Sequence, residues 1–195
     1  MMQEPGERSR ARQIFKSAYR STRNLPDRIL HRRRHREVLE RLSRMQRPRE
    51  ILVVCHANVC RSPYLQAVLQ RALPDIAVKS AGFVGSDRSV PAISLALSAT
   101  RGLDLSLYRS RPLKRSTVTS ADLVVVMDSN QARQIGTLFP MNHARIVVAG
   151  DLDPEFDSSR AITDPWNQSD DVFESSFNRL DRCAATLARV LQRAK

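Results

Sequence analysis

The stretch that decides the fold of this 195-residue chain reads Ile51-Leu52-Val53-Val54-Cys55-His56-Ala57-Asn58-Val59-Cys60-Arg61-Ser62-Pro63. Its first four residues form a short apolar run, which is typical of a strand buried in a parallel sheet. Ser62 and Pro63 favour a helix start, with Ser62 as the N-cap and Pro63 at the first helical position. The stretch therefore predicts a strand, a loop and a helix, the unit from which α/β folds are built.

The chain after this stretch repeats the alternation of strand and helix patterns. Further strands are predicted at 76–78, 123–126 and 145–149, and helices at 62–73, 91–101, 129–138 and 170–194. Tyr64, on the first of these helices, is interpreted as a helix-surface aromatic. We expect an α/β, doubly wound fold, with a four-stranded parallel sheet flanked by helices on both faces.

Residues 1–48 are predicted to be a basic N-terminal extension, flexible or helical, before a domain at 49–195. Residues 1–50 carry +9 of the net charge of +12, from 15 Arg and Lys against 6 Asp and Glu. Apolar residues between 27 and 45 have partly helical spacing, so we expect a helix there. The extension is either a solvated arm or an arm that contacts an acidic partner or an anionic membrane surface. Its basic residues are not interleaved with aromatic residues in the way that would favour nucleic acid as the partner.

The cysteine content favours a reducing, cytoplasmic setting. The chain has three cysteines, an odd number, and its basic N-terminus is not followed by the apolar region of a secretory signal. Cys183 is interpreted as a packing residue of the last helix. Cys55, His56 and Cys60 lack a second ligand pair at zinc spacing, so we expect neither a metal nor another cofactor.

Cys55 and Arg61 are separated by five residues, in a loop that enters a helix. Such a loop can turn successive backbone N–H groups inward and, with the positive end of the helix, form an anion site. The same field favours a thiolate over a thiol. Because the planar guanidinium of Arg61 can grip two phosphate oxygens, the loop predicts a phosphate site with a sulfur nucleophile at its floor.

The loop resembles the active-site loop of the low-molecular-weight protein tyrosine phosphatases, whose pattern is Val-Cys-x-Gly-Asn-x-Cys-Arg-Ser-Pro. Here Ala57 replaces the family glycine, which raises the question of a backbone angle that alanine resists. The resemblance covers about residues 49–193. It implies that phosphate is bound by the loop residues His56, Ala57, Asn58, Val59, Cys60, Arg61 and Ser62.

The resemblance extends to residues that support the loop. Ser80-Ala81-Gly82 matches a family segment, and Tyr108 stands where the family usually has a histidine. In the family, the residues that correspond to Asn58, Ser62, Ser80 and Tyr108 form a hydrogen-bond network that holds the loop. Whether the hydroxyl of Tyr108 replaces the histidine is open at this level.

Asp164-Pro165-Trp166 is similar to the family's Asp-Pro-Tyr acid loop. The resemblance implies that Asp164 donates a proton to the leaving phenolate and that Trp166 packs on the substrate ring. Three nearby carboxylates are weaker candidates for the acid: Asp151, Asp153 and Asp157.

These residues predict a cysteine-dependent protein-tyrosine phosphatase that works through a phosphocysteine. Its expected partner is a phosphotyrosine protein, with a bacterial-type tyrosine kinase as one candidate. A protein-arginine phosphatase of the same fold is an alternative, although that subgroup carries Thr where this chain has Val59. A weakly active phosphate-binding module is another alternative. Cys60 is either a reversible disulfide partner of Cys55 or a packing residue.

Overall fold

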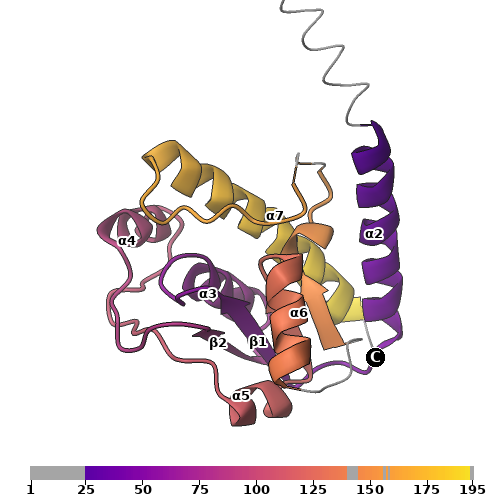
Figure 1. Ribbon diagram of the computed structural model, residues 1–195, viewed down its shortest axis with the longest axis horizontal. Coiled ribbons are helices and arrows are strands. Elements are labelled where there is room, and N and C mark those ends of the chain that lie inside the picture. The colour runs from indigo at the N-terminus through magenta and orange to yellow at the C-terminus, as the bar shows by residue number, and fades with distance from the viewer. Residues whose placement is uncertain (1–24, 140–144, 156, 158, 194–195) are drawn as a thin grey trace, which may run out of the picture.

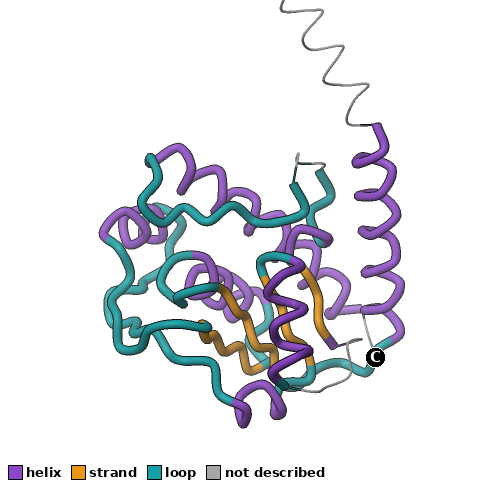
Figure 2. The backbone as a smooth tube through the Cα atoms, viewed as in Figure 1, coloured by secondary structure: helices purple, strands orange, loops and turns teal. Residues whose placement is uncertain are grey.

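The computed structural model describes residues 25–139, 145–155, 157 and 159–193. Within them, a four-stranded sheet has the order β2-β1-β3-β4, and every strand pair is parallel. Figure 1 shows helices on both sides of this sheet, and Figure 2 shows the strands between them. The strands are β1 (Glu50–Cys55), β2 (Ala77–Gly82), β3 (Leu123–Val126) and β4 (Ile146–Val148). The helices are α2 (Leu25–Arg44), α3 (Arg61–Ala72), α4 (Ala92–Ala99), α5 (Arg115–Ser120), α6 (Ser129–Leu138) and α7 (Asp170–Arg193), with the 3-10 turn η2 (Ala149–Asp151).

Each face of the sheet packs into its own buried cluster. Ile51 and Val53 of β1 point into the larger cluster, which also holds apolar residues of α2, α3 and α7. Leu52 and Val54 point the other way, into a cluster with Val118 of α5 and residues of α6. Side chains of a strand alternate between faces, so an apolar run buried on both sides is what a covered parallel sheet requires. The predicted α/β fold is confirmed.

The structure differs from the predicted elements at one strand and contains one helix that was not predicted. The second strand does not end at residue 78 but runs to Gly82, because Lys79 and Ser80 pair with Leu52 and Val53 of β1 despite their polarity. Helix α5 was not predicted, since the sequence Arg-Ser-Thr-Val-Thr-Ser is poor in strong helix formers. Burial of Val118 against the sheet accounts for that helix.

The predicted helix of the N-terminal extension is present as α2 and packs against the rest of the protein. Val38 and Leu42 are buried in the larger cluster, 5% and 1% exposed. The side chains of His35 and Arg41 hydrogen-bond the backbone oxygens of Asp151 and Ile146, at 2.8 and 3.0 Å. Helix α2 therefore covers the β4 side of the sheet (Figure 1). The proposed flexibility of residues 1–24 concerns a segment outside the described residues, and the domain boundary at residue 48 stays a prediction.

None of the helices in the described part of the chain combines the length and the apolar character that crossing a membrane requires.

We predict that Leu42→Ala lowers the free energy of unfolding by about 2–5 kcal/mol, because it leaves a cavity in the core. Leu30→Ala on the same helix is the matched control, since Leu30 is 41% exposed, and its effect should stay within about 1 kcal/mol. Urea denaturation of the full chain measures both values. Equal effects of the two substitutions would show that α2 is not packed as described.

Candidate active site

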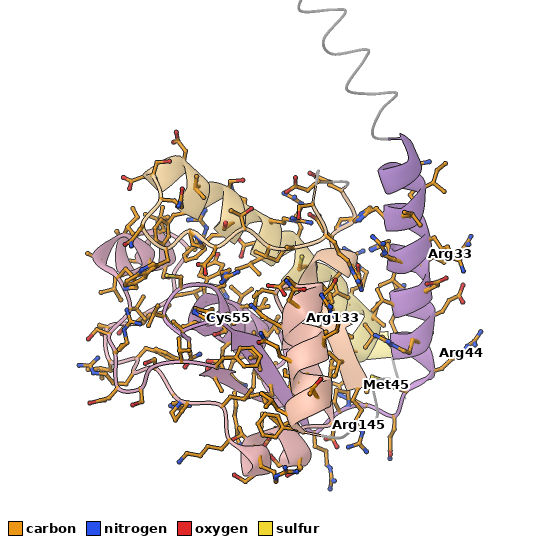
Figure 3. All side chains as sticks on the ribbon, in the orientation of Figure 1. Arg33, Arg44, Met45, Cys55, Arg133 and Arg145 are labelled. Atoms are coloured by element: carbon orange, nitrogen blue, oxygen red, sulfur yellow. The ribbon has the colours of Figure 1, made fainter. Side chains whose placement is uncertain are left out.

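Cys55 is the last residue of β1, and the loop that follows leads directly into α3. Its side chain is buried, and its Sγ lies 3.0 Å from the hydroxyl oxygen of Ser62. Figure 3 labels Cys55 at this end of the sheet. The carboxyl ends of parallel strands are where such folds bind ligands, so the nucleophile predicted from the sequence occupies the expected place.

A cleft of about 220 Å³ opens above this loop, and segments far apart in the sequence line it. The loop forms its floor, and the segments after β2 and before α7 form its walls. Of the residues predicted to bind phosphate, Asn58 and Ser62 are buried and do not line the cleft. The cleft is lined by Cys55, His56, Ala57, Val59, Cys60, Arg61, Val84, Arg88, Asp164 and Trp166.

Arg61 is the first residue of α3, and its guanidinium is held from two sides. Nη1 donates to the backbone oxygen of Ile162 at 3.0 Å, and Nη2 forms an ion pair with Asp164 Oδ2. Nε is buried without a hydrogen-bond partner among the described residues. A buried donor of this kind is costly, so Arg61 is oriented to receive an acceptor on the side of its Nε.

Asn58 is the residue that sets the shape of the loop. It has a positive φ of 54°, while Ala57 does not take the left-handed conformation that its glycine counterpart suggested. Its side-chain nitrogen donates to the hydroxyls of Ser62 and Ser80, at 2.8 and 3.0 Å. Ser62 does not cap α3: the N-cap position is Cys60, without a side-chain hydrogen bond.

Tyr108 completes this network through its hydroxyl. The hydroxyl donates to Asn58 Oδ1 at 2.6 Å and lies 2.7 Å from Ser80 Oγ. Burial raises the pKa of Tyr108, so the phenol keeps the proton that it donates. The hydroxyl thus contacts Asn58 and Ser80, two members of the predicted supporting network. Gln66, which the sequence did not single out, accepts from Ser80 at 2.6 Å.

Gly82 lets β2 approach the loop. A Cβ at this position would lie 2.7 Å from the Asn58 backbone nitrogen and 2.8 Å from the Ala57 carbonyl carbon. Real Cβ atoms do not come so close, so any other residue would push the loop away from β2.

The other candidate acids lie outside the cleft and are held by arginines. Asp153 is fully buried and pairs with Arg179 and Arg182, at 3.0 and 2.8 Å. Asp151 pairs with Arg160, and Asp157 with Arg179. Asp164 is the carboxylate that lines the cleft.

Arg179, which the sequence did not single out, organises the segment before Asp164. It is 3% exposed and donates to the backbone oxygens of Ser159 and Ala161, at 2.7 and 2.8 Å. An arginine on an amphipathic helix gives no sequence signal for this role, because an exposed position would look the same.

Two further positions depart from the sequence interpretation. Tyr64 is buried rather than exposed: its ring stacks on Phe177 with centroids 3.8 Å apart, and its hydroxyl donates to Asp181. Arg88, from the segment after β2, lies 4.9 Å above the Trp166 ring at the rim of the cleft. No motif marked Arg88, since only the fold brings these two segments together.

Comparisons with known proteins agree with this geometry. The sequence profile of the family described as "Low molecular weight phosphotyrosine protein phosphatase" matches residues 50–195. The probable low molecular weight protein-tyrosine-phosphatase EpsP of Ralstonia nicotianae is 37% identical over 134 residues, which cover 68% of this chain and 88% of EpsP.

Solved structures of two related enzymes superpose on this one. The tyrosine phosphatase Wzb of Escherichia coli K30, in complex with sulphate, gives a TM-score of 0.67 at 27% identity, covering 73% of this chain and 97% of Wzb. The YwlE arginine phosphatase of Geobacillus stearothermophilus gives 0.67 at 28% identity, covering 74% and 94%.

We predict that Tyr108→Phe lowers kcat/KM for p-nitrophenyl phosphate by about tenfold and stability by about 1–2 kcal/mol, because Asn58 and Ser80 lose a buried partner. Tyr64→Phe is the matched control, since it removes a similar hydroxyl hydrogen bond away from the cleft. It should cost stability but leave kcat/KM within about twofold. If both variants lose activity equally, the Tyr108 hydroxyl has no special part in holding the loop.

We also predict that iodoacetate at pH 7 modifies Cys55 well before the other two cysteines. Burial raises the pKa of Cys60 to about 12 and raises that of Cys183 as well, so at pH 7 both remain unreactive thiols. Peptide mass spectrometry after timed quenching measures the three rates, and phosphate should slow the modification of Cys55. Labelling of Cys60 as fast as Cys55 would contradict this prediction.

Proposed function

Since the chain belongs to the low molecular weight phosphotyrosine protein phosphatase family and is a cysteine-dependent phosphatase, we propose that it hydrolyses phosphotyrosine in proteins with Cys55 as nucleophile. One observation supports this assignment above the others: Cys55, Arg61 and Asp164 line a single cleft, although Asp164 comes 103 positions after Arg61 in the sequence. The three side chains supply a nucleophile, a charge for the phosphoryl oxygens and a proton.

The first step transfers the phosphoryl group from the tyrosine oxygen to Cys55. Arg61 and the loop N–H groups hold the equatorial oxygens of the phosphoryl group. The Cys55 thiolate attacks phosphorus from the side opposite the leaving tyrosine oxygen. The S–P bond forms, the P–O bond to tyrosine breaks, and the protonated carboxyl of Asp164 gives its proton to the leaving phenolate. Substrate phosphate takes the place of Asp164 at Arg61, which leaves the carboxyl beside the leaving oxygen.

The second step returns the enzyme to its starting state. The carboxylate of Asp164 accepts a proton from a water molecule, and the water oxygen attacks the phosphorus of the phosphocysteine. The S–P bond breaks, inorganic phosphate leaves and Cys55 is again a thiolate. The hydroxyl of Ser62, 3.0 Å from Cys55 Sγ, is placed to stabilise that thiolate.

The rim of the cleft suits a phosphorylated aromatic residue. Trp166 is 41% exposed and lines the cleft beside Val84, so its ring can pack on a tyrosine ring. Arg88, held over Trp166, adds a positive charge where the residues flanking a phosphotyrosine would pass. The proposed partner is a protein that carries phosphotyrosine, and a bacterial-type tyrosine kinase is one candidate. The proposed location of the reaction is the cytoplasm.

A phosphoarginine substrate is the second candidate function, supported by the similarity to the YwlE arginine phosphatase. Val59, 3% exposed, lines the cleft where that subgroup resembles this loop but carries Thr. A methyl group in place of a hydroxyl removes a hydrogen-bonding group that a guanidinium could use, so Val59 favours phosphotyrosine. The intact Cys55, Arg61 and Asp164, which line one cleft, argue against a phosphate-binding module without turnover.

We predict that Cys55→Ser abolishes turnover of p-nitrophenyl phosphate and that Asp164→Asn lowers kcat by about 10²–10⁴-fold, since it removes the proton donor. The loss for Asp164→Asn should be smaller for leaving groups of lower pKa, which need less protonation. Cys183→Ser is the control, because Cys183 is buried on α7 and away from the cleft. Activity that survives Cys55→Ser would overturn the proposed function.

We further predict that a phosphopeptide panel ranks phosphotyrosine above phosphoarginine and phosphoserine. Val59→Thr should raise the ratio of phosphoarginine to phosphotyrosine turnover by supplying the missing hydroxyl. Steady-state phosphate release from matched peptides gives these ratios. Faster turnover of phosphoarginine by the unsubstituted chain would decide for the second candidate.

A further inference from the structure

A second hollow lies between α2, α6 and the end of β4, away from the catalytic cleft. Its volume is about 570 Å³, within the range of about 300–1,000 Å³ of small-molecule sites. In the described part of the chain it shares no lining residue with the catalytic cleft. It is lined by Arg34, Glu37, Val38, Arg41, Ser129, Ala132, Arg133, Ile146, Val148, Asp151 and Arg160.

The charges of this hollow are not balanced. Arg160 binds Asp151 through two hydrogen bonds, of 2.8 and 2.6 Å. Glu37 pairs with Arg33, which does not line the hollow. The other three arginines form no ion pair with a described residue: Arg34, Arg41 and Arg133.

Two of these three guanidinium groups form a hydrogen bond with a described residue. Arg41 donates to the Ile146 backbone oxygen at 3.0 Å, and Arg133 donates to Asn130 of its own helix. The pKa of Arg41 is lowered, mainly by burial and further by the charge of Arg160, against an opposing effect of Asp151. Like charges gathered around a partly buried hollow repel one another, and a bound anion would relieve that repulsion.

We propose that this hollow is a second anion site, which binds a small ligand carrying phosphate groups. Guanidinium groups recognise phosphate oxygens with planar, charge-assisted hydrogen bonds, and here three of them have no carboxylate partner. Apolar side chains, among them Val38 and Val148, form the buried part of the wall and suit an apolar portion of the ligand.

Helix α2 supplies part of this site from outside the segment that the family profile matches. The family profile begins at residue 50, whereas Arg34 and Arg41 come from α2. The packing of Val38 and Leu42 fixes the face of α2 that looks into the hollow. Figure 3 shows Arg33 and Arg44 on the opposite side of α2, pointing away from the domain, and Arg133 on α6.

The test is isothermal titration calorimetry of the full chain with pyrophosphate. We expect one binding event in the catalytic cleft, reported independently by inhibition of p-nitrophenyl phosphate turnover, and a second event in the hollow. Arg34→Gln with Arg133→Gln should weaken the second event about tenfold or more, because two charge-assisted contacts are lost. Arg32→Gln with Arg44→Gln removes the same net charge from residues outside the hollow and should leave both events within about twofold.

A second experiment compares binding of the chain to vesicles that contain phosphatidylglycerol with binding to vesicles of phosphatidylcholine alone. Binding of pyrophosphate that depends on Arg34 and Arg133 assigns the hollow to soluble phosphates. Binding of anionic vesicles alone, with the same dependence, assigns it to a lipid headgroup. If neither ligand binds outside the cleft, or if both double variants weaken binding equally, the arginines are only a solvated basic surface and the proposal fails.

Discussion

The close approach of the loop after Cys55 to strand β2 is the constraint on which the site depends. A phosphate cradle needs backbone N–H groups that face inward, and here Asn58 provides the turn by taking a φ of 54°. The side-chain nitrogen of Asn58 donates hydrogen bonds to Ser62 and Ser80, and its side-chain oxygen accepts one from Tyr108. Gly82 leaves the space in which the loop lies against the strand. With the loop held there, Cys55 and Arg61 line the same cleft.

Asp164 is brought to this loop by a different kind of interaction. Asp164 lies on a segment without regular structure, which α7 holds through Arg179 and Arg182. These arginines share the buried carboxylate of Asp153. Buried ion pairs add little to stability once desolvation is counted, and their value here is the fixed path that they give the backbone toward Asp164. The positions of Cys55 and Asp164 thus rest on two separate sets of contacts.

Helix α2 joins an Arg-rich segment to this catalytic fold by burying one of its faces. Val38 and Leu42 enter the core, while Arg41 covers a carbonyl of the edge strand β4. The same packing holds arginines at the wall of the second hollow. The fold therefore fixes the position of part of the positive charge of the N-terminal region, because Arg34 and Arg41 line the second hollow.

The sequence by itself determined the parallel α/β fold and the loop between Cys55 and Arg61, because these follow from apolar periodicity and from a motif read along the chain. The role of Asp164 as the acid stays a prediction from that motif. The sequence did not determine the length of β2, the burial of Tyr64, or the parts played by Gln66, Arg88 and Arg179. Those depend on contacts between segments far apart in the sequence. A polar side chain has the same local pattern whether it faces solvent or a buried partner, so only the tertiary structure decided which of these residues serve the site.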